Sequence, residues 1–105
     1  MASITFKGQP LQTCGSLPET NSKAPGFTLT GTDLSDVSKT DFGAQKLVLN
    51  IFPSVDTSVC AAAVRRFNEE AAKLGDTQVL CICMDLPFAQ ERFCGAEGID
   101  NVTML

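Results

Sequence analysis

The two longest apolar stretches of the chain predict buried strands with a helix between them. The run Lys-Leu-Val-Leu-Asn-Ile-Phe-Pro at 46–53 is rich in β-branched residues and stops at a proline, which is typical of a strand buried on both faces. A second buried strand is expected for Gln-Val-Leu-Cys-Ile-Cys-Met at 78–84. Between them, residues 60–74 carry apolar side chains at helical spacing, and Cys60 extends the apolar face backwards by four residues from Val64.

The polar residues of this segment predict how the helix begins, ends and pairs its charges. We expect one of residues 56–58 to cap its start and Gly75 to end it. The opposite face offers three ion pairs at i,i+4 spacing, each of which stabilises a helix slightly: Arg65 with Glu69, Arg66 with Glu70, and Glu69 with Lys73.

Smaller elements are expected on both sides of this unit. The pattern predicts a β-hairpin over 1–15, a strand at 27–30, a short helix around 88–93 and a further strand at 101–105. Strand, helix, strand, helix, strand is a βαβ arrangement, so the fold class is α/β with a parallel core. The chain ends inside the last expected strand, and we therefore expect a C-terminally incomplete fold.

The length and the net charge of the chain limit the classes of function that it can have. A chain of 105 residues fits one domain, 1–105, and its 44% of hydrophobic residues can fill one core. The net charge is −4, and no basic cluster is longer than Arg65-Arg66, which argues against nucleic acid and anionic membranes as partners. The longest apolar run, 79–84, is too short to cross a bilayer, and no signal peptide is visible. The expected location is the cytoplasm.

The chain has no histidine and five cysteines. The missing histidine excludes Ser-His-Asp hydrolysis, Cys-His proteolysis and histidine-ligated metal sites as the work of this chain. An odd number of cysteines without a secretory signal argues for buried thiols together with a reactive one, rather than for a disulfide scaffold.

Cys60 is the first candidate for the reactive thiol. It lies in the first turn of the expected helix, after a loop that leaves the carboxyl end of a buried strand, where active sites of open α/β sheets gather. The partial positive charge of a helix N-terminus favours thiolate over thiol. The alternative is a cysteine that only packs on the apolar face of the helix.

Cys94 is the second candidate, because a sulfenic acid at Cys60 would need a second thiol to condense with it. It closes the short expected helix and is followed by Gly95 and Gly98, which would let the segment rearrange. A buried cysteine that caps the helix is the alternative interpretation.

The other cysteines are interpreted as small hydrophobic residues. Cys81 and Cys83 point to the same face of an apolar strand, and Cys14 lies in the expected hairpin. A thiolate metal site that uses Cys81, Cys83 and one more cysteine is the rival, but no Cys-x-x-Cys spacing supports it. We expect no metal and no cofactor. A thioredoxin-type dithiol is absent, since three alanines follow Cys60.

The stretch from Pro53 to Cys60 fits the peroxiredoxin pattern P-x-x-x-T-x-x-C, with Thr57 at the threonine position. Together with 49–57 and the run Asp-Leu-Pro-Phe-Ala-Gln-Glu-Arg-Phe-Cys-Gly-Ala-Glu-Gly at 85–98, the chain resembles the bacterial thiol peroxidases, the atypical two-cysteine branch of the peroxiredoxins. The resemblance covers the whole chain. It implies a thioredoxin-like fold with an added N-terminal β-hairpin.

The resemblance also implies a mechanism. Cys60 would be the peroxidatic cysteine and Cys94 the resolving one, and the enzyme would reduce hydrogen peroxide and organic hydroperoxides through a sulfenic acid and an intramolecular disulfide. Thioredoxin would be the reductant, and the protein would form a homodimer. Thr57 would hydrogen-bond the peroxide and the thiolate, and Pro53 would shield the sulfur from water.

The chain departs from the family in its length. Family members continue well beyond this point, and the additional part supplies further strands, a closing helix and an arginine that pairs with the peroxidatic thiolate. Arg65, Arg66 and Arg92 are the only arginines here, and none clearly replaces it. The alternatives are therefore a catalytically impaired fragment of such an enzyme, or a fragment that only binds a partner.

Overall fold

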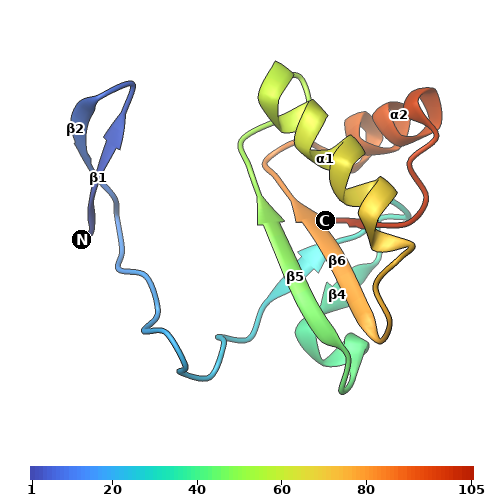
Figure 1. Ribbon diagram of the computed structural model, residues 1–105, viewed down its shortest axis with the longest axis horizontal. Coiled ribbons are helices and arrows are strands. Elements are labelled where there is room, and N and C mark those ends of the chain that lie inside the picture. Colours follow the sequence, from blue (N-terminus) through green and yellow to red (C-terminus); the bar gives the residue numbers. More distant parts are fainter.

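The computed structural model describes residues 1–105 and has the elements that the sequence predicts, in the predicted order, together with a short strand and a 3-10 helix at 36–42 (Figure 1). In chain order they are β1 (Ser3–Phe6), β2 (Gln9–Gln12), β3 (Thr28–Thr30), β4 (Asp36–Ser38), the short 3-10 helix η1 (Lys39–Phe42), β5 (Lys46–Ile51), α1 (Ser58–Ala71), β6 (Thr77–Ile82), α2 (Pro87–Glu97) and β7 (Thr103–Met104). Neither α-helix has the length and apolar character that crossing a membrane requires.

The centre of the fold is a parallel sheet, as the sequence predicts, and its strand order is β5, β6, β7. Ile51 pairs with Ile82, so β5 and β6 end side by side, and Leu80 pairs with Thr103 of β7. The helices α1 and α2 form the two crossovers of this βαβαβ unit (Figure 1).

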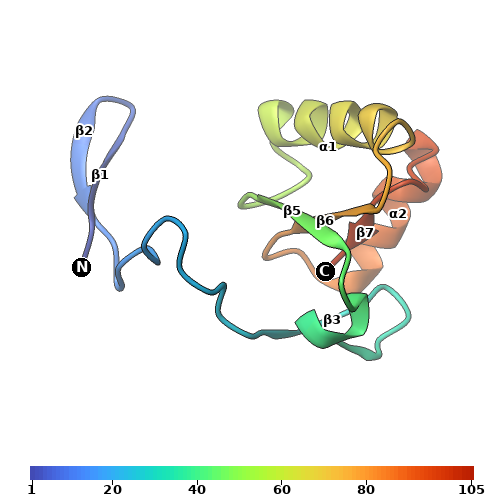
Figure 2. The same cartoon turned by 60° about the horizontal axis from the view of Figure 1, so that its bottom comes forward.

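The sheet is covered on both sides. Figure 2 shows α1 on one face and the β3–β4 hairpin with η1 on the other, while α2 lies beside α1. The two strands of that hairpin pair antiparallel, with Leu29 opposite Val37.

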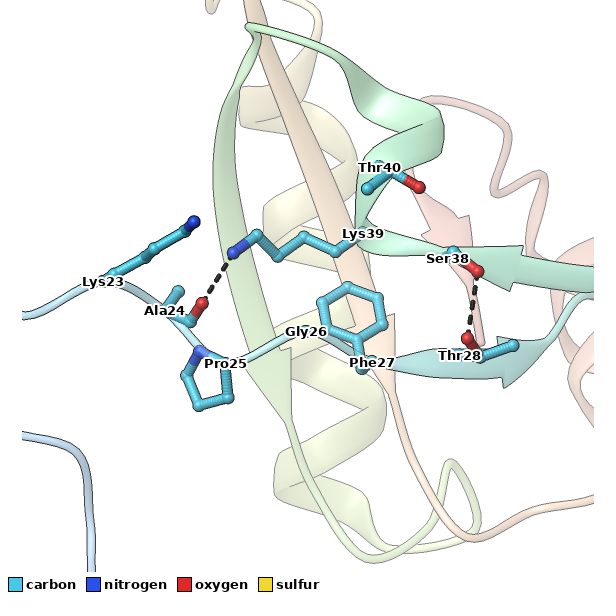
Figure 3. Close-up of a pocket in the computed structure, with 9 residues that line it drawn as sticks. All are labelled: Lys23, Ala24, Pro25, Gly26, Phe27, Thr28, Ser38, Lys39 and Thr40. Atoms are coloured by element: carbon cyan, nitrogen blue, oxygen red, sulfur yellow. Dashed lines mark hydrogen bonds between the residues drawn. The ribbon is translucent and has the colours of Figure 1, made fainter.

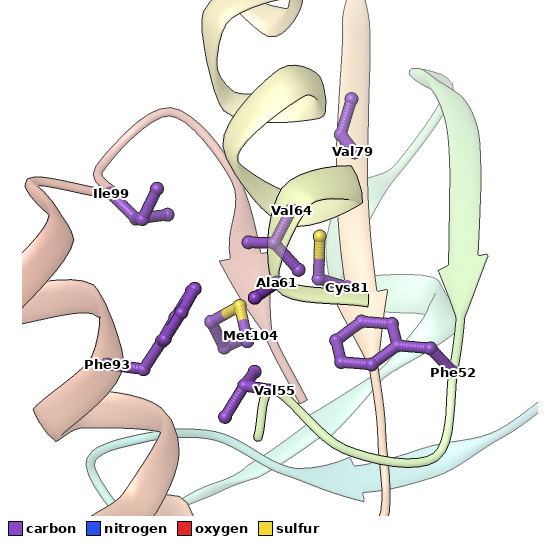
Figure 4. Packing of buried hydrophobic residues seen from close by; sticks show 9 residues of the cluster. All are labelled: Phe52, Val55, Ala61, Val64, Val79, Cys81, Phe93, Ile99 and Met104. Atoms are coloured by element: carbon purple, nitrogen blue, oxygen red, sulfur yellow. The ribbon is translucent and has the colours of Figure 1, made fainter. Parts of the chain in front are cut away.

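The hydrophobic core lies between α1, α2 and the sheet (Figure 4). Its nine buried members are Phe52, Val55, Ala61, Val64, Val79, Cys81, Phe93, Ile99 and Met104. Val64 and Cys81 are completely buried. The apolar face predicted for α1 is therefore confirmed at its centre, and so is the packing role of Cys81.

Burial on both faces is confirmed for β6 and wrong for β5. The neighbouring residues Leu80 and Cys81 point to opposite faces of β6, and both are fully buried. In β5 only Val48 packs against the core, whereas Leu49 and Ile51 are 42% and 70% exposed. The reason lies in how the two faces of β5 are covered, because α1 packs on the face of Val48 while the opposite face, with Leu49 and Ile51, stays partly open to solvent.

The helix α1 starts as predicted and ends earlier than predicted. Thr57 is its N-cap, within the expected range. The helix stops at Ala71, so Leu74 leaves the apolar face and is 46% exposed. The chain turns at Asp76, whose φ is 49°, and not at Gly75.

The N-terminal hairpin forms as predicted and stands apart from the rest of the chain (Figures 1 and 2). Its turn consists of Lys7 and Gly8, both with positive φ, as a two-residue hairpin connection requires. Residues 13–27 connect the hairpin to β3. Cys14 lies at the start of this connection and is exposed, so its predicted packing role is wrong.

Burial makes a testable distinction between Cys81 and Cys14. Burial is the main cause that raises the pKa of Cys81 to about 11, and only the thiolate form reacts with an alkylating reagent. At pH 8 we expect iodoacetamide to modify the exposed Cys14 and to leave Cys81 unmodified, with the Cys81 rate rising as the pH approaches 11. Peptide mass spectrometry measures both sites in one sample. Equal rates at pH 8 would contradict this assignment.

Candidate active site

Two loops meet at the carboxyl end of the sheet and form the candidate site. One follows β5 and carries Pro53 and Thr57, and the other follows β6 and carries Asp85. Because β5 and β6 end in register, the loops leave the same edge. The backbone N–H of Met84 donates to the carbonyl of Pro53 at 3.4 Å, which joins the loops directly.

Cys60 is the third residue of α1 and lies in its first turn, as the sequence predicts. Its side chain is half-buried and packs against the core. The backbone N–H groups of Ser58, Val59 and Cys60 have no hydrogen-bond acceptor, and the Thr57 side chain does not cap the helix. These donors, with the helix dipole, favour negative charge at this turn.

The Thr57 hydroxyl is used within its own loop. It donates to the carbonyl of Ser54 at 2.8 Å, and the Thr57 N–H donates to the same carbonyl at 3.3 Å. Since the hydroxyl proton is committed, the lone pairs of Thr57 Oγ1 remain available as acceptors. Pro53, at the start of the loop, is exposed.

Asp85 anchors this loop, and sequence reasoning missed its role. Its Oδ1 accepts a hydrogen bond from Ser54 Oγ and its Oδ2 one from the Val55 N–H, both at 2.8 Å. The Cys83 thiol also donates to Oδ2, at 3.4 Å. Burial acts to raise the pKa of Asp85, but the bonds from Val55 and Ser54 outweigh it and lower the pKa below its usual range. The only signal in the sequence was an aspartate directly after a buried strand.

Cys94 lies on the neighbouring helix, α2, and packs against the same core as Cys60. Burial, followed by the nearby Cys83, raises the pKa of the Cys94 thiol. The prediction that Cys94 closes its helix is wrong, because α2 runs on to Glu97 and ends at Gly98, whose φ is 66°. All five cysteines are free.

Polar contacts fasten the helix of Cys94 to the helix of Cys60. Arg65 donates from Nε and Nη2 to the two carboxylate oxygens of Glu97, at 3.0 and 2.9 Å. The guanidinium also lies over the ring of Phe93, 5.8 Å from its centroid. Further along α1, Asn68 Oδ1 accepts from the backbone N–H groups of Asp100 and Asn101.

These contacts change the predicted pattern of ion pairs. Arg66 bonds Glu70 at 3.0 Å as expected. Arg65 reaches Glu97 instead of Glu69, because α2 offers a bidentate partner, and Lys73 pairs with Glu70 instead of Glu69. All three arginines of the chain therefore have carboxylate partners, since Arg92 lies 3.5 Å from Asp56.

The largest pocket lies away from the cysteines. It has a volume of about 850 Å³ and lies between the segment before β3 and the start of η1 (Figure 3). Lys39 Nζ reaches across it and donates to the carbonyl of Ala24. No candidate catalytic residue lines it, and the structure brings no three Cys, Asp or Glu side chains together in a group that could hold a metal ion.

Comparison with known proteins identifies the family to which the chain belongs. The family model described as Redoxin matches residues 19–105. The thiol peroxidases of Mycobacterium tuberculosis and Mycobacterium bovis are each 58% identical over 102 residues, which cover 97% of this chain. The chain spans 61% of the length of these curated relatives.

Solved structures agree on the fold. A crystal structure of a peroxiredoxin-like protein from Aquifex aeolicus has a TM-score of 0.85 at 34% identity, covering 97% of this chain and 60% of that one. The thiol peroxidase from Chromobacterium violaceum has a TM-score of 0.80 at 19% identity, covering 98% and 61%, and supports the fold alone. The predicted thioredoxin-like α/β fold is confirmed, and with the match over 19–105 this chain belongs to the Redoxin family.

Proposed function

We propose that this chain is a thiol-dependent peroxidase that reduces hydrogen peroxide and organic hydroperoxides, with Cys60 as the peroxidatic cysteine. The observation that carries the proposal is the position of Cys60 in the first turn of α1, next to three N–H groups that have no acceptor. The names of the mycobacterial relatives support the reaction class.

In the first step the Cys60 thiolate attacks one oxygen of the peroxide. A sulfur–oxygen bond forms, the oxygen–oxygen bond breaks, and the departing oxygen leaves as water or an alcohol after taking up a proton. The free N–H groups at the start of α1 would stabilise the charge that develops on the reacting oxygens. Thr57 Oγ1 would accept a hydrogen bond from the peroxide O–H, because its own proton is bound to the Ser54 carbonyl. Pro53 would limit the access of water.

In the second step the Cys94 thiol condenses with the Cys60 sulfenic acid, which gives a disulfide and water. The two sulfurs must come to about 2 Å, with Cα atoms within roughly 7 Å. Burial raises the pKa of Cys94, so in the present conformation it stays a thiol. We therefore expect the Cys60 turn and α2 to loosen after the first step.

The remaining parts of the proposal rest on the family resemblance. Thioredoxin would reduce the disulfide by giving it two electrons, its own dithiol becoming a disulfide, and the protein would act as a homodimer in the cytoplasm. Each of the three arginines pairs with a carboxylate, and the free N–H groups at the start of α1 would stabilise the Cys60 thiolate.

A non-reducing peptide map after one equivalent of hydrogen peroxide tests the two cysteine assignments. We expect a dominant cross-link between Cys60 and Cys94, which thioredoxin and its reductase remove. Cys94→Ser should instead stop at the sulfenic acid of Cys60, which only a second equivalent of peroxide would convert to the sulfinic acid, and Cys60→Ser should consume no peroxide. Oxidation spread evenly over all five cysteines would contradict the proposal.

The contact between Arg65 and Glu97 makes a second prediction about resolution. The hydrogen bonds from Arg65 lower the pKa of Glu97, so the pair is charged at neutral pH and holds α2 in place. Glu97→Gln should speed disulfide formation after the first step by about two- to fivefold, the range for one exposed ion pair. Quenched-flow alkylation with mass spectrometry measures this rate.

Glu69→Gln is the matched control, since the pair of Glu69 with Arg66 lies within α1. It should leave the rate of disulfide formation unchanged. An unchanged or slower rate in Glu97→Gln would show that this contact does not limit the movement of Cys94.

A further inference from the structure

The carboxylate of Asp85 has a place in the site that the peroxidase proposal does not use. We propose that Asp85 is a positioning residue for the reaction of Cys60 with peroxide, acting by holding the Ser54–Thr57 turn and, through it, the Thr57 hydroxyl. This inference rests on the proposed function.

The chain of contacts runs from Asp85 to Thr57 without a break. Asp85 holds the Ser54 hydroxyl and the Val55 N–H with its two oxygens. Ser54 Oγ in turn accepts from the Asp56 N–H at 3.0 Å, and the Ser54 carbonyl accepts from the Thr57 hydroxyl at 2.8 Å. The orientation of the Thr57 hydroxyl therefore depends on where Ser54 is held.

The same turn is fixed on its other side by the core. Val55 is 3% exposed and packs with Phe93 and Met104 in the buried cluster (Figure 4). Its N–H bond to Asp85 and its buried side chain together leave the turn little freedom to shift. The turn leads directly into the helix of Cys60. The Thr57 carbonyl accepts the first hydrogen bond of α1, from the Ala61 N–H at 2.9 Å.

A carboxylate suits this position better than an amide. Both donors, the Ser54 hydroxyl and the Val55 N–H, need an acceptor, and only an ionised carboxylate offers one at each oxygen. An asparagine would present an NH₂ group to one of them and leave that donor without a partner. Asp85→Asn therefore keeps the size and shape of the side chain while removing one of its two hydrogen bonds to the turn.

The prediction separates positioning from general support of the fold. Reaction with peroxide needs Thr57 and the N–H groups placed around the reacting oxygens, whereas alkylation by iodoacetamide needs only an accessible thiolate. Asp85→Asn should lower the rate constant of Cys60 with hydrogen peroxide by about 10- to 100-fold, the usual effect of a small misplacement. Its rate with iodoacetamide should stay close to that of the wild-type chain.

The experiment measures both rate constants at Cys60 by quenched-flow peptide mass spectrometry, in five chains: wild type, Asp85→Asn, Ser54→Ala, the double variant and a control. Because Asp85 acts through Ser54, the two substitutions should not multiply. The rate constant of the double variant with peroxide should be about as low as that of Asp85→Asn alone. Asp36→Asn is the control, since the exposed Asp36 side chain makes no hydrogen bond, and it should leave both rates unchanged.

The outcomes are distinguishable. An unchanged peroxide rate in Asp85→Asn, or equal losses toward peroxide and iodoacetamide, would overturn the positioning role while leaving the peroxidase proposal intact. A wild-type chain that does not react with peroxide would overturn the proposed function itself. If circular dichroism shows Asp85→Asn unfolded, Ser54→Ala decides, because it removes the hydrogen bond between Ser54 and Asp85 and keeps the carboxylate. A peroxide rate equal to wild type there would overturn the proposal.

Discussion

The parallel register of β5 and β6 is the constraint on which the rest of the site depends. Ile51 and Ile82 end their strands side by side, and this places the loop before Cys60 against the loop that carries Asp85. The bond between Ser54 and Asp85 spans 31 residues of sequence and exists only in this register. A slip of one residue would reverse which side chains of β6 face α1, moving Cys81 out of the core. The hydrophobic pattern of β6 thus specifies the geometry of the polar site at its end.

The two proposed reactive cysteines occupy different environments on neighbouring helices. Cys60 lies at a helix start beside N–H groups that have no acceptor, whereas burial raises the pKa of the Cys94 thiol. This difference sets an order for the proposed chemistry, in which Cys60 reacts first and Cys94 becomes reactive only when its helix moves. The contact of Arg65 with the end of α2 and those of Asn68 with the segment after it are the interactions that such a movement must rearrange.

The sequence predicts well what depends on neighbours along the chain. The strand pattern, the N-terminal hairpin and the position of Cys60 in the first turn of α1 all follow from local spacing. It does not predict contacts made across the fold. The role of Asp85 cannot be found from local spacing because its partners lie 30 and 31 residues away, and helical spacing pairs Arg65 with Glu69 because it takes no account of α2. The sequence predicts burial of β5 on both faces because an apolar run does not reveal which face of its strand the fold leaves open.

The central claim is that Cys60 is the sulfur that reacts with peroxide, and trapping the sulfenic acid tests it most directly. The Cys94→Ser chain, treated with one equivalent of hydrogen peroxide in the presence of dimedone, should carry the label at Cys60 and at no other cysteine. This result would set Cys60 apart from Cys14, which is more exposed, and from Cys83, which lies at the same end of the sheet. A label at Cys14 or Cys83 with none at Cys60 would contradict the account.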